Sequence, residues 1–117
     1  MKIALSSDGN QGLDSTLSYH FGRCPYFVMA DVDEGGSVRS VEIVANPAEG
    51  GHQPGVVPQF IKEQGANVII SGGMGPRAVQ WFQDLGIKAV ITQGGRRLAD
   101  VLDDYLKGKL KDADGGS

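Results

Sequence analysis

The topology of this chain is set by residues 26–45, which read YFVMADVDEGGSVRSVEIVA. Two runs rich in β-branched and aromatic residues, Tyr26–Val32 and Ser37–Ala45, flank the short polar segment Asp33–Gly36, which ends in two glycines. Such a pair of runs around a short glycine-containing segment is typical of a β-hairpin. We therefore predict two neighbouring antiparallel strands here, and this pair limits how the rest of the chain can be arranged.

Three further strands are predicted where short, continuous apolar runs occur. They are Lys2–Ser6, Asn67–Ser71 and Lys88–Thr92, with the apolar centres IAL, VII and AVI. Runs of this kind are typical of central strands that are buried on both faces of a sheet.

Three helices are predicted where apolar residues recur at helical spacing. Their ranges are Pro54–Gln64, Pro76–Leu85 and Arg96–Lys107. Two of them begin with proline, and a glycine follows each of the three. Proline in the first turn and glycine just beyond the last turn are the usual signals for the two ends of a helix.

The predicted order of elements is β-β-β-α-β-α-β-α, with a hairpin early in the chain and helical crossovers late. Right-handed crossovers place the fourth and fifth strands beside the first strand and parallel to it. The hairpin then occupies the other side, which gives the strand order 3-2-1-4-5 with the second strand antiparallel to the rest. This is the ribonuclease H-like arrangement, an α/β fold of three layers with a five-stranded mixed sheet and helices on both faces.

Length and composition indicate one globular domain. The chain has 117 residues, and we expect residues 1–107 to form the domain and residues 108–117 to be a disordered tail. The single cysteine cannot form an internal disulfide, and we find neither a signal peptide nor an apolar run long enough to span a bilayer. A net charge of −3 argues against binding of duplex nucleic acid. We therefore expect a cytoplasmic protein with neither a nucleic acid nor a membrane as partner.

The predicted topology brings one unusual segment to the ligand-binding edge of the sheet. In open α/β sheets, ligands bind beyond the carboxyl ends of the parallel strands. Because the second strand is antiparallel, the segment before it, HFGRCPYF (residues 20–27), lies at that same edge. It holds His20, Arg23 and Cys24, the only thiol in the chain. These groups suit a metal, a sulfide or an anion, with Arg23 as a binding residue and His20 and Cys24 as candidate metal ligands.

Two glycine-rich turns are expected at the same edge, each between a strand and a helix. Free backbone N–H groups and a helix dipole make such a turn suitable for binding an anion. Neither turn has the spacing of a Walker or dinucleotide-binding motif. The alternative is that the glycines only allow tight turns. The candidate binding residues are Gly72, Gly73, Met74 and Gly75 in the first turn and Gly94, Gly95 and Arg96 in the second.

His52, in the long loop between the third strand and the first helix, is the third candidate metal ligand. Each candidate ligand has an ordinary structural alternative. Cys24 could be an inert buried side chain, His20 could be satisfied by the backbone, and His52 could be exposed to solvent.

Several catalytic chemistries are not supported by the sequence. The four spaced ligands of a tetrahedral zinc site are absent, and Cys24 before a proline is a poor nucleophile. The clustered carboxylates of a two-metal nuclease are also missing, because the fourth strand ends in Ser71-Gly72. We therefore expect a binding protein and not an enzyme.

Four stretches of the sequence resemble a known family. They are the opening MKIA, the segment HFGRCPYF, the loop end Gly50-Gly51-His52 and the turn SGGMG (residues 71–75). These stretches are similar to the dinitrogenase iron–molybdenum cofactor biosynthesis family. This family includes NifX, NafY and the C-terminal part of NifB. The resemblance runs from Met1 to about Leu106, with the motifs in matching order.

Within this family, the chain looks most like small stand-alone members such as the orange protein. That resemblance implies a ribonuclease H-like fold and a carrier of a molybdenum–copper sulfide cluster, held without covalent attachment. An iron–molybdenum–sulfur cluster or its precursor is the alternative cargo. A P-loop ATPase is the kind of protein partner that the resemblance implies. One cysteine cannot replace the several thiolates that iron–sulfur clusters usually require, so a cluster that brings its own sulfides fits better.

The sequence is also compatible with two other kinds of function. The chain could be a regulatory module that binds a nucleotide or a phosphorylated metabolite at the glycine turns. It could also be an interaction domain for another protein.

Overall fold

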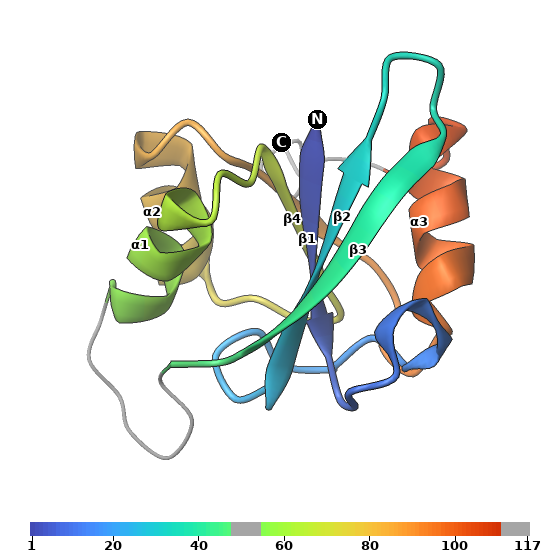
Figure 1. The fold of residues 1–117 in the computed structure, drawn as a ribbon. Helices are drawn as coiled ribbons and strands as arrows, with labels where there is room; N and C mark the ends of the chain where they lie inside the picture. Colours follow the sequence, from blue (N-terminus) through green and yellow to red (C-terminus); the bar gives the residue numbers. More distant parts are fainter. Residues whose placement is uncertain (48–54, 111–117) are drawn as a thin grey trace.

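The computed structural model describes residues 1–47 and 55–110, which form a five-stranded mixed sheet between two layers of helices (Figure 1). The strands are β1 (Lys2–Ser7), β2 (Tyr26–Val32), β3 (Val38–Ala45), β4 (Val68–Ser71) and β5 (Lys88–Ile91). The helices are the short 3-10 helix η1 (Gly12–Asp14) and the α-helices α1 (Val56–Glu63), α2 (Pro76–Asp84) and α3 (Leu98–Leu106).

The topology agrees with the prediction from the hairpin. The strand order is β3-β2-β1-β4-β5. β2 is antiparallel to both of its neighbours, whereas β1, β4 and β5 are parallel to one another. The carboxyl ends of β1, β3, β4 and β5 and the start of β2 therefore lie at one edge of the sheet.

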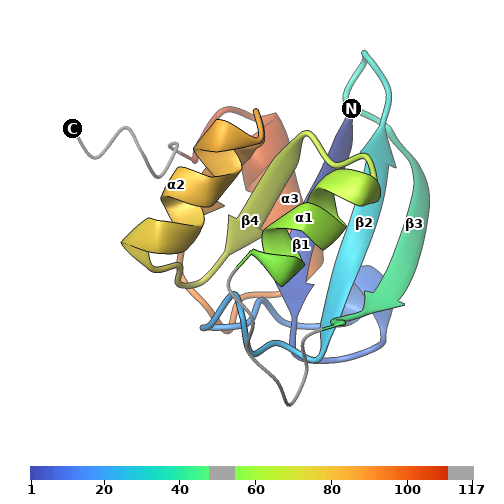
Figure 2. The same ribbon diagram turned by 90° about the vertical axis from the view of Figure 1, so that its left-hand side faces the viewer.

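Helices cover both faces of the sheet (Figures 1 and 2). α1 and α2 lie over one face, and α3 with η1 lies over the other. The side chains of β2 alternate between these layers because successive residues of a strand point to opposite faces. Phe27 and Met29 belong to the core under α1 and α2, while Val28 and Ala30 belong to the core under α3. β3 has only one neighbouring strand and is exposed along most of its length.

The third helix begins later than the periodicity predicts. α3 starts at Leu98 and not at Arg96, because Arg97 has an extended backbone (φ −64°, ψ 135°) and forms a bridge with Thr16. The Leu98 N–H donates to the carbonyl of Ser15 at 2.9 Å, so a distant loop and not a side-chain cap begins the helix. Arg96 and Arg97 consequently belong to the β5–α3 loop.

β2 has the predicted bounds, and the other boundaries shift by no more than two residues. β3 begins at Val38 because the Ser37 N–H is bound by the Asp33 carboxylate of the hairpin turn at 2.9 Å. α1 begins at Val56, and its predicted start at Pro54 lies outside the described residues. Gly108 (φ +75°) follows the end of α3, while residues 111–117 of the predicted tail also lie outside the described residues. Within residues 1–47 and 55–110, we find no helix with the length and apolar character needed to cross a membrane.

Candidate functional site

A pocket of about 530 Å³ opens at the edge where the parallel strands end. Two segments form it, one before β2 and the other between β4 and the first turns of α2. They are far apart in sequence, and the reversed direction of β2 brings them together. Its lining consists of Tyr19, His20, Phe21, Gly22, Arg23, Gly73, Met74, Gly75 and Ala78.

Backbone hydrogen bonds hold these two segments side by side. The Phe21 N–H donates to the Gly73 carbonyl at 3.1 Å, and the Gly72 N–H donates to the Ser18 carbonyl at 2.8 Å. A Cβ added at Gly72 would lie 2.5 Å from the Ser18 carbonyl oxygen and 2.7 Å from the Gly94 Cα. Glycine is required at position 72 because the neighbouring backbone approaches so closely.

The second glycine turn does not line this pocket. The ring of Tyr19 lies against it, so that a Cβ added at Gly94 would lie 2.6 Å from the Tyr19 Cδ1. At Gly95, which has a positive φ of 85°, the added Cβ would lie 2.5 Å from the Tyr19 hydroxyl. The structure thus favours the packing alternative for Gly94 and Gly95. Tyr19, which the sequence analysis did not single out, separates this turn from the pocket, and its side chain is 60% exposed.

The two arginines after β5 also lie outside the pocket, and each has a carboxylate partner. Arg96 donates to Asp104 at 2.7 Å, and this hydrogen bond holds the pKa of the Asp104 carboxyl below its ordinary value. Arg97 donates to Asp14 at 2.6 Å. Both guanidinium groups therefore have carboxylate partners in α3 and η1, and Arg96 does not join Arg23 in lining the pocket.

Cys24 is buried and does not line the pocket. Its side chain is 1% exposed, and its Sγ donates to the Phe21 carbonyl at 3.2 Å. Burial raises the pKa of this thiol to about 12, so at neutral pH it is protonated and poorly suited to bind a metal. Asn46, at the end of β3, donates to the Cys24 carbonyl at 2.8 Å and the Gly22 carbonyl at 3.3 Å. It was missed by the sequence analysis, although its position just after a strand at this edge is the signal that could have found it.

His20 is exposed at the mouth of the pocket beside Arg23, as the sequence predicts. His52 lies outside the described residues. Among residues 1–47 and 55–110 there is no group of three or more His, Cys, Asp or Glu side chains that could hold a metal ion. Ligands brought by the bound group itself would therefore have to complete any metal centre here.

The chemistry of the lining suits an anion with a soft, polarisable surface. Among the described residues that line the pocket, His20 and Arg23 are the only ionisable side chains besides the Tyr19 phenol, and none is a carboxylate. Among the hydrogen bonds of the described residues, none uses the amides of Met74 or Gly75, which precede the N-terminus of α2. Free amides and the helix dipole attract negative charge there. The thioether of Met74 adds a soft contact.

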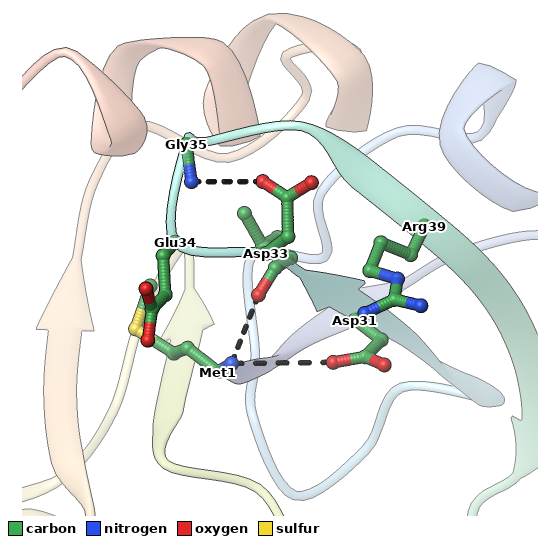
Figure 3. A pocket seen from close by; sticks show the side chains of 7 residues that line it. Met1, Asp31, Asp33, Glu34, Gly35 and Arg39 are labelled. Atoms are coloured by element: carbon green, nitrogen blue, oxygen red, sulfur yellow. Dashed lines mark hydrogen bonds and ion pairs between the residues drawn. The ribbon is translucent and has the colours of Figure 1, made fainter.

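A second pocket, of about 560 Å³, lies at the opposite end of the sheet and has the opposite character (Figure 3). It is lined by Asp31, Asp33 and Glu34 together with Arg39 and the Met1 amino group. The Asp33 carboxylate accepts the N–H of Gly35 at 2.9 Å and shapes the hairpin turn. The excess of carboxylates disfavours an anionic ligand in this second pocket.

The fold and the pocket define a small α/β protein of the ribonuclease H-like type, with a pocket at the carboxyl edge of its parallel strands. The chain belongs to the dinitrogenase iron–molybdenum cofactor family, whose model matches residues 1–108. This match confirms the family resemblance seen in the sequence motifs.

Individual relatives agree with this assignment. The protein MJ0580 of Methanocaldococcus jannaschii is 36% identical over 113 residues, which are 95% of this chain and 90% of that protein. PH0822, which has a crystal structure, is 38% identical in sequence to this chain. Its structure superposes with a TM-score of 0.83 over 96% of this chain and 96% of that one.

Two further solved structures have names that bear on function. The apo form of the orange protein from Desulfovibrio gigas is 28% identical, with a TM-score of 0.83 and coverage of 96% of this chain and 92% of that one. A NifB-like protein from Thermotoga, TM1290, is 28% identical, with a TM-score of 0.77 and coverage of 95% and 91%. The family and these structures support a cofactor-binding or carrier role.

Proposed function

We propose that this protein carries an anionic metal–sulfur cluster of the molybdenum–copper sulfide type, held non-covalently in the pocket of residues 19–23 and 73–78. The observation that carries the proposal is the composition of this pocket. It combines Arg23 and His20 with free amides and a thioether, and none of its lining residues within 1–47 and 55–110 is a carboxylate. The similarity to the orange protein supports the choice of cluster, and an iron–molybdenum–sulfur cluster is the alternative cargo.

Each part of the pocket has a defined task in this proposal. The permanently charged Arg23 guanidinium compensates the negative charge of the cluster and donates hydrogen bonds to its sulfides. The Met74 and Gly75 amides donate from the other side, while Tyr19 and Phe21 provide apolar contact and exclude water. His20 binds a metal or donates a hydrogen bond at the exposed side. Cys24 shapes the loop without binding the cluster.

The proposed role is transfer of a bound group and not catalysis. The part of the pocket that the structure describes offers no paired acid and base, and a cluster that is delivered to another protein must be released without breaking a covalent attachment. A partner such as a P-loop ATPase would donate or receive the cluster. We place the carrier in the cytoplasm, which the single unpaired cysteine supports.

The test is anaerobic reconstitution of the apo-protein with copper and tetrathiomolybdate, followed by gel filtration. We expect a coloured complex that co-elutes with the protein at one cluster per chain. Trp81, the only tryptophan, follows the pocket residue Ala78 by about one turn of α2, so its fluorescence should be quenched during the titration. Equal colour retention by an unrelated protein of similar charge would refute the proposal.

A matched pair of arginine variants tests the site itself. Arg23→Ala should lower cluster retention at least ~tenfold, because a charge-assisted contact contributes about 1.5–3 kcal/mol. Arg39→Ala is the control, since Arg39 is equally exposed but lies in the acidic pocket at the other end of the sheet. Equal retention by the two variants would place the cluster elsewhere. Thermal stabilisation by nucleotides in place of the cluster would favour the regulatory alternative.

A further inference from the structure

The outer edge of β3 is a long exposed surface that the proposed function does not use. β3 is eight residues long, lies at one end of the strand order and pairs only with β2. Its apolar side chains Val38, Val41 and Ile43 are 40%, 41% and 40% exposed. The opposite edge strand, β5, has only four residues. Long, apolar edges are surfaces on which another strand can pair.

The pairing of β3 with β2 shows which backbone groups face outward. The Asn46 N–H donates to the Pro25 carbonyl at 3.0 Å, and the register from there to Ser40 is continuous. Because hydrogen-bonded and non-bonded residues alternate along antiparallel strands, the N–H and C=O groups of Val41 and Ile43 point away from β2. The same two residues therefore offer both a free backbone edge and a half-exposed apolar side chain.

The side chains of these residues lie on the α3 face of the sheet. Val41 pairs with Ala30 and Ile43 pairs with Val28, and both partners belong to the core under α3. Gly12 of η1 lies beside both side chains, because a Cβ added there would lie 3.8 Å from Val41 Cγ1 and 4.0 Å from Ile43 Cδ1. Val41 and Ile43 nevertheless stay 41% and 40% exposed. An added strand would continue this apolar row.

We propose that β3 pairs antiparallel with β3 of a second copy of this chain, with Val41 opposite the partner's Val41. The outward groups of Val41 on both strands then bond to each other across a two-fold axis. In this register Ser40 lies opposite the partner's Glu42. Arg39 is the extra residue of a β-bulge next to Ser40, and its side chain lies beside Asp31, which pairs with Ser40 in β2 (Figure 3). Because Arg39 adjoins the residue opposite the partner's Glu42, these opposite charges approach each other twice in the dimer.

Charge disfavours one of the two neighbouring registers, the one shifted toward Ile43. A shift of two residues preserves the direction of the backbone groups but sets Glu42 directly opposite the partner's Glu42. Like charges at directly opposed positions destabilise a strand pair. The β3 register skips Arg39 between Ser40 and Val38, which is a β-bulge that limits the ladder to about five residues on each strand. An interface of this size is small, so the dimer dissociates on dilution.

Sedimentation of the full chain from about 10 µM to about 1 mM tests the proposal, because a small interface exchanges in this range. We expect a reversible monomer–dimer equilibrium. Val41→Lys sets two ammonium groups opposite each other and should weaken association roughly tenfold or more. Ile91→Lys is the matched control, because Ile91 is 39% exposed on the other edge strand and should leave association unchanged. A chain that stays monomeric at every concentration overturns the proposal, as does equal weakening by both variants.

A charge exchange keeps the test valid if Val41→Lys fails to fold. Arg39→Glu alone brings like charges together and should weaken the dimer several-fold, as should Glu42→Arg alone. The double variant should restore association, which a merely structural effect would not do. Hydrogen exchange gives a second readout, because the outward amides of Val41 and Ile43 should become protected as concentration rises. Additive losses in the double variant, or protection that is independent of concentration, would overturn the proposed register.

Discussion

The alkaline pH dependence of stability should reveal Cys24 as a structural residue. Burial raises the pKa of its thiol from the ordinary value of 9.0 to about 12. A pKa that is higher in the folded state stabilises the fold fully below pH 9.0, and this contribution is lost as pH rises toward 12. Three pKa units correspond to about 4 kcal/mol, of which about 2 kcal/mol is lost by a pH of about 10.5.

The assay is urea unfolding of the wild-type chain and of Cys24→Ala, both kept reduced, at several pH values between about 7.5 and 10.5. Every other ionisable group is common to the two proteins, so the effects of these groups cancel in the difference between the two free energies of unfolding. At neutral pH the variant should be less stable, because it leaves a small void among buried side chains. The difference should then shrink by about 2 kcal/mol toward the alkaline end.

A difference that stays constant across this range would refute the reasoning, because it would mean that the thiol titrates alike in the folded and unfolded chains. The same variant also tests the cluster proposal. Cys24→Ala should retain a reconstituted cluster as well as the wild-type chain does, since the thiol is 1% exposed and lies outside the pocket lining. Loss of the cluster from this variant, with folding intact, would restore Cys24 as a ligand.

Three further predictions concern the loops around the pocket. Gly73→Ala should destabilise the fold by roughly 1–3 kcal/mol in thermal or urea unfolding, because the new Cβ would clash with the Tyr19 carbonyl. Gly75→Ala should be neutral, because a Cβ at position 75 has no neighbouring atom within 4 Å. Equal losses would show that the close approach is not what matters. Asn46→Ala removes the hydrogen bonds to the loop before β2 and should lower the free energy of unfolding by about 1–3 kcal/mol in the same assay. It should also weaken cluster retention. Unchanged retention would show that these hydrogen bonds do not support the site. Arg96→Ala should leave retention unchanged but raise the pKa of the Asp104 carboxyl, measured by NMR titration, because that pKa is lowered mainly by the Arg96 hydrogen bond. An unmoved pKa would contradict this pairing.

The architecture could be predicted because its signals are local and strong. The hairpin around Asp33–Gly36 sets one antiparallel pair, and the apolar runs of β1, β4 and β5 require burial on both faces. Handedness of the crossovers then leaves one strand order. The start of α3 was predicted wrongly because periodicity extends through Arg96 and Arg97, while a tertiary bridge to Thr16 holds the backbone there extended.

The candidate site could be predicted only as far as its edge of the sheet. The sequence predicts that Arg23, His20 and the first glycine turn lie together. His20, Arg23, Gly73, Met74 and Gly75 do line one pocket, whereas Gly72 is not among its lining residues. The sequence predicts the same anion-binding role for the second glycine turn as for the first. The ring of Tyr19 makes the two turns different, and the sequence carries no local signal for the direction of that ring.

The sequence by itself determined the strand order and the edge of the sheet at which the pocket lies, because both follow from hydrophobic periodicity, turn chemistry and the handedness of L-amino acids. Only the tertiary structure decided which polar groups are free. Arg96 is held by Asp104, Cys24 is buried and protonated, and Arg23 lines the pocket. Partners and burial depend on contacts between distant segments, so the same residue types could serve binding or packing until the fold placed them.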